Sequence, residues 1–474
     1  MAASAVLAVG ATTVPSPAQA QTAPAAVTTL AELRAALAAS DGKTPLTVTL
    51  APGAIAIDGV PLAVKGDVTI TGAGRGATTL DASAAARAIE ATAGGKLRIE
   101  GLTIRGGVNP TSGGGAIKTS GVDLRLTDVL LVGGAAEADG GAVEVEGGSL
   151  TIERSELREN GAQHGGAVVA GGAAVTITDT RFEENGAAGN GGALLVSYPT
   201  SLAIRGTTFV GNTATRDGGA IHLEGMQRAA DDELSIDAEF TGNYAGGEGG
   251  AVLVASTSDG LTEGLLAFDG SSFSDNVADA GGAIGVRDGR VRVADGDFTG
   301  NRASDDDGSG GGAIAAAGDL VVAGSAFDAN ESTANGGAIS STGRFRVEKS
   351  TFEANVSGGL GGALALVGSA TPVVRATRFD ANVAASRAGA VWRGGHGLEN
   401  EDNTFDGNEP SSEDVVVDTP ATAAVARSEP GAPSPAGGAA GGVPIAGVAA
   451  AAGALAIVLV VMSVMLARRR RAAA

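Results

Sequence analysis

The sequence contains no cysteine and very few aromatic or histidine residues. Of its 474 residues, one is Trp, two are Tyr and three are His. Without cysteine there are no disulfides and no thiol chemistry, so stability has to come from packing. Three histidines and no cysteine also argue against a zinc site.

Positive charge is scarce as well, because the formal net charge is −21 at pH 7. A nucleic-acid-binding surface needs an excess of Lys and Arg, so we expect no nucleic-acid partner. An acidic polysaccharide would be repelled unless a cation bridged it. There is no phosphate-binding glycine loop, since the glycines lead into repeats and not into a strand–loop–helix unit.

Glycine is abundant, with 77 residues, and two marks recur in phase along the chain. The first is Gly-Gly-Ala followed by an aliphatic residue, and it starts at Gly114, Gly140, Gly165, Gly191, Gly218, Gly249, Gly281, Gly311, Gly336 and Gly361. The second is Phe-x-x-Asn, which includes the pairs Phe182/Asn185, Phe327/Asn330, Phe352/Asn355 and Phe379/Asn382. One unit of about 25 residues is therefore repeated.

Within each unit the apolar residues alternate with polar ones, which predicts short strands. Such a unit is too small to bury a core alone, so stacking on its neighbours is required. The pattern predicts an all-β parallel β-helix in which Phe stacks on Phe and Asn on Asn inside the tube. We expect the residue after the aliphatic one, such as Lys118, Glu144, His222 or Trp392, to face outward because its identity varies.

The two marks resemble the polymorphic membrane protein repeats of bacterial surface proteins, over residues 113–408. The resemblance implies a right-handed β-helix of the pectate-lyase-like kind, displayed at the cell surface and linked to adhesion.

Residues 28–112 are interpreted as an N-terminal cap and the first coils. Leu30, Leu33 and Leu37 lie on one face of a predicted helix, Thr29 with Glu32 forms a capping box, and Gly42 is a plausible stop. A short amphipathic helix would cover the open hydrophobic end of the β-helix, and it looks like the cap of pectate-lyase-like proteins.

Both chain ends carry targeting signals in our interpretation. Residues 1–20 end in an Ala-x-Ala cleavage pattern typical of a signal peptide, but the positively charged start is missing, so either the start codon lies further upstream or these residues are not a signal peptide. Residues 409–442 are a Pro/Ala/Gly-rich linker. Residues 443–467 carry no charge and predict a single transmembrane helix, followed by a basic cytoplasmic tail at 468–474. The β-helix would then be extracellular.

A sortase sorting signal is the alternative for the C-terminal end. The stretch Val443–Gly447 resembles its Leu-Pro-x-Thr-Gly motif at the Pro and the last Gly but has Ala in place of Thr. The protein would then be attached to the cell wall.

Four residues are candidates for ligand binding. His222 and Trp392 occupy the same position in different coils, and Arg393 and His396 lie beside Trp392. Exposed aromatic residues such as these, together with Tyr198 and Tyr244, suit a surface glycan, and a protein ligand is the alternative. Gly395-His396-Gly397 resembles part of a pectin-hydrolase motif, but the required aspartate pairs do not precede it.

The only metal candidate is the acidic run Asp305, Asp306 and Asp307, which could hold Ca²⁺ or form a solvated loop. No other cofactor is expected. This run lies in one of three inserted segments, Gly225–Glu233, Ser256–Gly264 and Ala303–Gly310, which would form one patch if they leave the same corner.

The sequence as a whole favours a membrane-anchored adhesin or ligand-binding module over an enzyme. A surface carbohydrate-active enzyme, either a polysaccharide lyase or a hydrolase, and a passive stalk stay open as alternatives. An enzyme would need carboxylate or basic groups that converge on one outward face.

Overall fold

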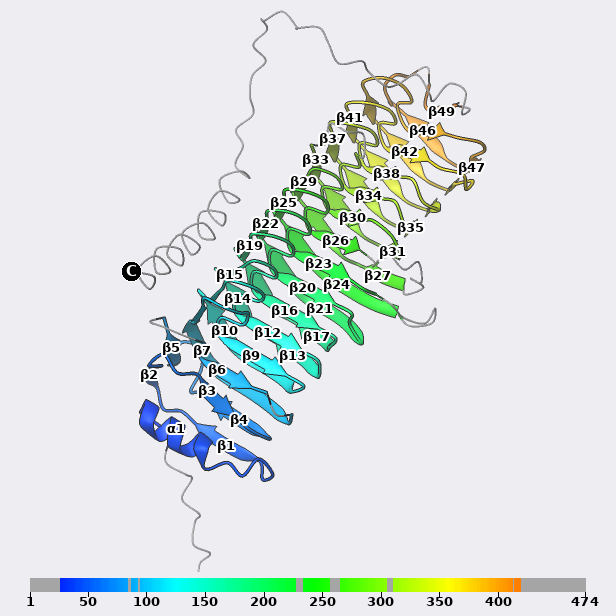
Figure 1. The fold of residues 1–474 in the computed structure, drawn as a ribbon. Helices are drawn as coiled ribbons and strands as arrows, with labels where there is room; N and C mark the ends of the chain where they lie inside the picture. The colour runs from blue at the N-terminus through cyan, green and yellow to red at the C-terminus, as the bar shows by residue number, and fades with distance from the viewer. Residues whose placement is uncertain are drawn as a thin grey trace, which may run out of the picture.

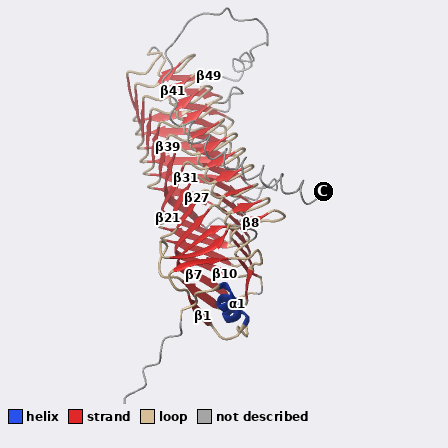
Figure 2. Ribbon diagram, turned by 90° about the vertical axis from the view of Figure 1, so that its left-hand side faces the viewer, coloured by secondary structure: helices blue, strands red, loops and turns tan. Residues whose placement is uncertain are grey.

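The computed structural model describes residues 26–83, 87–92, 94–226, 233–255, 265–304, 310–411 and 413–418. In this part the chain winds into an elongated parallel β-helix of the right-handed type, with one helix at its N-terminal end (Figure 1). The predicted fold is confirmed. Figure 2 shows the strands of successive coils stacked as ladders.

Three parallel sheets run the length of the described solenoid. The GGA sheet contains the ten strands that follow Gly-Gly-Ala, together with two strands before them and two after them. Its fourteen strands are β3 (Leu62–Val64), β6 (Ile89–Ala91), β9 (Ile117–Ser120), β12 (Val143–Glu146), β16 (Val168–Gly171), β20 (Leu194–Ser197), β23 (Ile221–Glu224), β26 (Val252–Ala255), β30 (Ile284–Val286), β34 (Ile314–Ala316), β38 (Ile339–Ser341), β42 (Leu364–Val367), β46 (Val391–Gly394) and β49 (Val415–Asp418).

The Phe sheet is the broadest, because most coils contribute two strand segments to it. Its twenty-four strands are β1 (Leu46–Thr49), β2 (Gly53–Ala56), β4 (Val68–Thr71), β5 (Thr78–Ala82), β7 (Lys96–Gly106), β10 (Asp123–Val132), β13 (Ser149–Glu153), β14 (Glu156–Arg158), β17 (Ala174–Thr178), β18 (Arg181–Glu183), β21 (Ser201–Val210), β24 (Glu233–Thr241), β27 (Leu265–Asp269), β28 (Ser272–Ser274), β31 (Arg290–Ala294), β32 (Asp297–Thr299), β35 (Asp319–Ala323), β36 (Ala326–Asp328), β39 (Phe345–Glu348), β40 (Thr351–Glu353), β43 (Val373–Arg375), β44 (Arg378–Asp380), β47 (Glu399–Glu401) and β48 (Thr404–Asp406).

The Asn sheet is formed by two-residue strands that follow the repeated Asn or its equivalent. Its eleven strands are β8 (Val108–Asn109), β11 (Ala135–Ala136), β15 (Gly161–Ala162), β19 (Gly186–Ala187), β22 (Thr213–Ala214), β25 (Tyr244–Ala245), β29 (Val277–Ala278), β33 (Arg302–Ala303), β37 (Glu331–Ser332), β41 (Val356–Ser357) and β45 (Val383–Ala384). A typical coil therefore visits the GGA sheet, the Phe sheet twice and the Asn sheet once.

The two glycines of Gly-Gly-Ala are needed for different structural reasons. The first has a positive φ, for example 54° at Gly165, which glycine adopts without steric cost. The second lies too close to the next coil for a side chain, since a Cβ on Gly166 would sit 2.1 Å from the carbonyl oxygen of Gly192. Both glycines are thus required by the corner that leads into each GGA strand.

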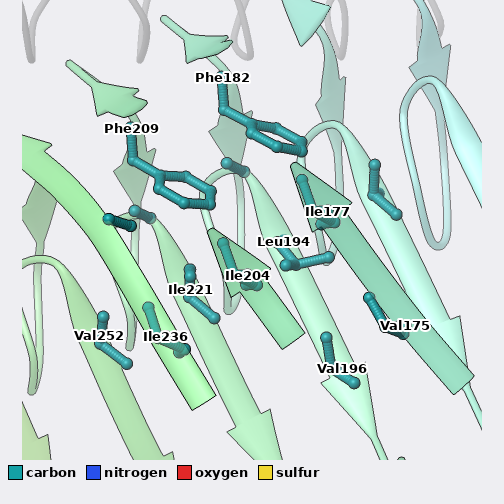
Figure 3. Close-up of a cluster of buried hydrophobic side chains, with 14 of the residues drawn as sticks. Val175, Ile177, Phe182, Leu194, Val196, Ile204, Phe209, Ile221, Ile236 and Val252 are labelled. Carbon is teal, nitrogen blue, oxygen red and sulfur yellow. The ribbon is translucent and has the colours of Figure 1, made fainter. Parts of the chain in front are cut away.

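The tube is filled by the aliphatic side chains of the GGA strands and by the aliphatic and Phe side chains of the Phe sheet (Figure 3). Val168, Val175 and Ile177 are fully buried, as predicted from the alternation. The phenylalanines form one continuous stack from Phe182 to Phe405, with ring centroids 4.6–5.2 Å apart and nearly parallel planes. The predicted stacking of Phe327, Phe352 and Phe379 is confirmed.

The repeated asparagines form a buried ladder in which each side chain bonds to its neighbours. The Nδ2 atom of Asn330 donates to Asn355 Oδ1 (3.0 Å) and to the carbonyl oxygen of Phe298 (3.0 Å). Its Oδ1 accepts from Nδ2 (2.9 Å) and from the backbone N–H (3.0 Å) of Asn301. The same pattern links Asn185, Asn355 and Asn382 to their neighbours, so buried polar groups that would be costly alone satisfy one another.

The helix α1 (Leu30–Ala38) covers the N-terminal end of the tube, as predicted (Figure 1). Its capping box is present: the backbone N–H of Glu32 donates to Thr29 Oγ1, and the Glu32 carboxylate accepts from the backbone N–H of Thr29. Leu33 and Leu37 are buried against the first coils. The helix ends at Ala38, earlier than the glycine at 42 that we interpreted as its stop, which lies in the following turn.

The solenoid extends further than the repeats predicted. Strand β49 pairs with β46 and continues the GGA sheet to Asp418, so the linker does not begin at residue 409 as predicted. The proposed signal peptide, most of the linker, the transmembrane segment and the basic tail lie outside the described residues. Within the described residues, no helix is long and apolar enough to cross a membrane.

Candidate functional site

The residue four positions after the first glycine of Gly-Gly-Ala, such as Lys118 after Gly114, forms a single column along the GGA sheet. This column, the +4 column, runs through Glu90, Lys118, Glu144, Val169, Leu195, His222, Leu253, Gly285, Ala315, Ser340, Ala365, Trp392 and Val416. The prediction that His222 and Trp392 share one position is therefore confirmed.

The prediction that this column is exposed is wrong. His222 is only 2% exposed and Trp392 only 7%. The reason is the corner before Gly-Gly-Ala, which folds over the column of the next coil: a Cβ placed on Gly285 would lie 3.2 Å from the Cβ of Glu248 in the preceding coil. The backbone of the preceding coil thus covers His222 and other residues of this column, whereas Glu146 and Glu224, two residues further along their strands, are partly exposed.

At the C-terminal end, the +4 column makes structural contacts. The indole Nε1 of Trp392 donates to Asp418 Oδ2 (2.9 Å), and its ring packs with Ala388, Val416 and Leu360. Neither Asp418 nor Val416 belongs to the repeats, so the sequence pattern gave no sign of this cover. Trp392 is not the exposed aromatic residue that we predicted.

Arg393 is also buried, and it makes hydrogen bonds to the backbone. It is 1% exposed, and its guanidinium donates to the carbonyl oxygens of Gly368 (2.6 Å), Ala370 (3.0 Å) and Gly397 (3.2 Å). Burial lowers the pKa of this group. Its donors are engaged with backbone and not available to a ligand, whereas His396 is exposed.

A group of titratable side chains gathers on the outer face of the GGA sheet near its N-terminal half. We call it the titratable strip, and it consists of Lys118, Asp139, Glu144, Glu146, His164, His222 and Glu224. Lys118 Nζ lies 2.9 Å from Glu144 Oε2 and 3.2 Å from Glu146 Oε1. Asp139 and His164 are register partners on adjacent coils at the residue before Gly-Gly-Ala.

The carboxyl groups of the strip have pKa values shifted in opposite directions. Burial raises the pKa of Asp139 and that of Glu144, although Lys118 opposes both shifts. The pKa of Glu224 is lowered, chiefly by His222, whose Nε2 lies 3.6 Å from Glu224 Oε2. Burial works against the charge of Lys118, yet Glu144 and Glu146 raise its pKa.

Apart from Glu144 Oε2, which is paired with Lys118, two buried polar atoms on the outer face near the strip have no hydrogen-bond partner among the described residues. They are His222 Nδ1 and Asn190 Oδ1. Asn190 precedes Gly191 in the coil before that of His222, which is the position that Glu248 holds relative to Gly285 two coils further on. A buried polar atom without a partner lowers stability. An apolar residue at position 222 would avoid this cost, as Leu195 and Leu253 do in the two neighbouring coils.

Opposite pKa shifts of this kind are typical of acid–base catalysis, but the spacing argues against a glycosidase pair. Glu144 and His222 are separated by three strand steps, through Val169 and Leu195. Three steps span about 14 Å, whereas the two carboxyl groups of a glycosidase lie about 5–9.5 Å apart. Because Glu224 belongs to the same strand as His222, it is too distant from Glu144 for this role.

A second surface feature is a cavity of about 450 Å³ on the outer face of the Phe sheet, lined by Arg75, Arg105 and Arg158 among others. Arg75 Nε lies 2.8 Å from Asp128, and Arg158 Nε lies 3.2 Å from Glu156. The arginines are thus offset by carboxylates, and the cavity carries no clear excess of positive charge.

The inserted segments do not all leave the same corner. The segment 225–233 lies between β23 and β24, and 256–264 lies between β26 and β27, so both join the GGA sheet to the Phe sheet. The segment 303–310 instead joins β33 of the Asn sheet to β34 of the GGA sheet. The predicted Ca²⁺ ligands Asp305, Asp306 and Asp307 lie outside the described residues, and the described residues contain no group of three side chains fit for a metal.

The sequence interpretation missed most of the strip. Only His222 was predicted to bind a ligand, because it shares the outward repeat position of Trp392, whereas Lys118 and Glu144 were predicted only to face outward. Asp139 and His164 precede Gly-Gly-Ala, and Glu144 and Glu224 lie on the GGA strands, so their proximity follows from the register between coils. A search for polar residues at equivalent repeat positions could have found them.

Comparison with known families supports the repeat assignment. Residues 179–197 and 206–224 match the model of the Chlamydia polymorphic membrane protein repeat. The resemblance predicted from the two marks is therefore confirmed for these repeats. No curated protein matches the chain significantly.

Among solved structures, the chain is similar to the A-module of the mannuronan C-5 epimerase AlgE4 of Azotobacter vinelandii, with 14% identity and a TM-score of 0.29 over 82% of this chain and 94% of that one. It is also similar to the catalytic unit of an alpha-1,3-glucanase of Streptomyces thermodiastaticus, with 15% identity and a TM-score of 0.29 over 79% of this chain and 65% of that one. We draw no functional conclusion from these similarities.

Proposed function

We propose that the protein is a cell-surface β-helix that acts as an adhesin or ligand-binding module. The match to the polymorphic membrane protein repeat supports the surface location. Every position that the repeat fixes, the aliphatic residue, Phe, Asn and the glycines, serves the interior or the corners. The variable residues are therefore free to determine what the outer face binds.

One observation carries the binding role. Titratable groups cluster on the outer face of coils 114–224, and two buried polar atoms beside them lack partners. In several later coils the same column holds small or apolar residues such as Leu253, Ala315 and Ala365. The fold alone does not require polar groups there, so their presence favours a function at the surface. A glycan or a protein remains the proposed partner.

Anchoring to the membrane is part of the proposal. Residues 443–467 would span the bilayer and Arg468–Arg471 would keep the C-terminus in the cytoplasm, because positive flanks remain inside. A reporter fused after Ala474 should then be active only in the cytoplasm. A protein recovered covalently bound to peptidoglycan would instead support the sorting-signal alternative and cell-wall attachment.

A surface carbohydrate-active enzyme is the second candidate, favoured by the opposite pKa shifts on the strip. The separation of about 14 Å between Glu144 and the strand of Glu224 argues against a glycosidase mechanism for these two carboxylates. Incubation of the full-length protein with polysaccharides, followed by measurement of reducing ends and of unsaturated products, tests for hydrolysis and for elimination.

The binding role is tested with cells that display the full-length chain. These cells should adhere to immobilised host-type glycans or to matrix proteins more than cells with the empty vector. A matched control is the Ser340→Ala variant, which changes the +4 column to the residue of the neighbouring coils, Ala315 and Ala365. Equal adhesion of displaying and empty cells on all surfaces would leave the passive stalk as the better interpretation.

A further inference from the structure

Tyr198 has a backbone conformation that its neighbours reserve for glycine. It follows β20 at the corner between the GGA sheet and the Phe sheet, and the equivalent residues in the three preceding coils and the next one are Gly121, Gly147, Gly172 and Gly225. All five have φ between 51° and 66°. This left-handed conformation is unfavourable for a tyrosine, which is one of fifteen non-glycine residues with a positive φ among the described residues.

The ring of Tyr198 forms a firmly supported, exposed platform. It lies against Gly225 of the next coil, where an added Cβ would be 2.6 Å from the ring atoms Cδ1 and Cε1. The residue is nevertheless 51% exposed, so part of the ring faces solvent. Its backbone N–H donates to the carbonyl oxygen of Glu224 (3.0 Å), which fixes the platform to the next coil. The ring thus lies directly on the backbone of Gly225, where a side chain would displace it.

Polar groups border this platform on the same two coils. Glu224, directly before Gly225, has a partly exposed carboxylate whose pKa is lowered chiefly by the hydrogen bond with His222. His222 lies behind it, buried and with one ring nitrogen unpartnered. An exposed aromatic face next to an ionised carboxylate provides an apolar surface and two strong hydrogen-bond acceptors side by side.

We propose that Tyr198 and Glu224 form a subsite for a neutral saccharide. The apolar C–H face of a sugar ring would stack on Tyr198, and its hydroxyl groups would donate to the Glu224 carboxylate. His222 acts as a positioning residue, because it contacts Glu224 and is itself buried. A uronic acid is a poor fit, since its carboxylate would meet that of Glu224 in a chain whose net charge is already −21. The proposal rests on the ligand-binding function proposed above and names its ligand class.

The test measures binding of the purified full-length protein to an array of neutral and uronic-acid oligosaccharides. The Tyr198→Gly variant introduces the residue found at the equivalent position of the three preceding coils and the next coil, so it should fold at least as stably as the parent. It should bind neutral oligosaccharides about tenfold more weakly, because the aromatic ring is lost. Tyr198→Phe keeps the ring and should bind within about threefold of the parent. Glu224→Gln removes the charge and should also weaken binding.

Two further variants separate a local role from a general one. Tyr244 is an exposed tyrosine on the Asn sheet, and Tyr244→Val introduces the residue of the next coil, Val277, so binding should not change. His222→Leu introduces the residue of both neighbouring coils. The variant should keep the fold. If His222 acts through Glu224, His222→Leu should weaken saccharide binding, and the pH dependence of its binding should differ from that of the parent.

The outcomes distinguish this subsite from the proposed function. If the parent binds neutral oligosaccharides and Tyr198→Gly binds them equally well, the subsite is wrong while the ligand-binding function stands. A preference of the parent for uronic-acid oligosaccharides would overturn the neutral class. If the parent binds no oligosaccharide, the subsite is overturned, and adhesion of the displaying cells decides separately whether a protein ligand supports the function.

Discussion

Replacing Asn330 by Ala should open the solenoid locally, because Asn330 Oδ1 accepts two buried hydrogen bonds from Asn301. The substitution leaves the backbone N–H and one Nδ2 hydrogen of Asn301 without an acceptor. Each buried donor without a partner costs about 1–3 kcal/mol, so the loss should be about 2–6 kcal/mol. Amide hydrogen exchange under native conditions measures it, since the free energy of opening at Asn301 should fall by this amount.

The N-terminal end of the ladder provides a matched control. Asn160 Oδ1 accepts only one bond, from the backbone N–H of Gly134, because the preceding coil has glycine at the Asn position. Its own Nδ2 donates to one carbonyl and one Asn side chain, as that of Asn330 does. Asn160→Ala should therefore cost about half as much, or about 1–3 kcal/mol. Equal losses for the two variants, or a loss below about 1 kcal/mol for Asn330→Ala, would refute the argument that paired donors hold the ladder together.

Three further results are expected. Phe352→Ala should cost about 3–5 kcal/mol in the free energy of unfolding, through lost burial and the cavity left between Phe327 and Phe379, and urea denaturation checks this. The raised pKa of Glu144 stabilises the fold below its ordinary value of 4.5 and this contribution is lost as the pH rises through the folded value, so Glu144→Gln should gain stability relative to the parent between pH 4.5 and 7. The lowered pKa of Glu224 has the opposite sign: its contribution is present above 4.5 and is lost as the pH falls, so Glu224→Gln should be relatively less stable at pH 7 than at pH 4. Thermal denaturation over this pH range measures both, and the same direction of change in the two variants would contradict the assignment.

The spacing of Gly-Gly-Ala and Phe-x-x-Asn was sufficient to predict the solenoid, its capping helix and the stacks of Phe and Asn. These features are local or repeat at a fixed interval, and a parallel stack brings equivalent positions together whatever lies between them. The positions of Phe352 and Asn330 in the core could therefore be inferred from sequence. The extra strand β49 could not, because it carries neither mark.

The exposure of side chains on the outer face could not be predicted, because it depends on contacts between residues of different coils. Alternation along a strand determines that His222 and Trp392 point away from the core, and the sequence shows this. Whether such a side chain reaches solvent is decided by the corner of the preceding coil and, at Trp392, by Asp418. Likewise, the repeat spacing places Tyr198 at a position that is glycine in the neighbouring units, but only the fold shows its positive φ and the contact of its ring with Gly225. The interior repeats and so can be inferred from the period, whereas the outer face is built from residues of different coils whose meeting depends on how the corners fold.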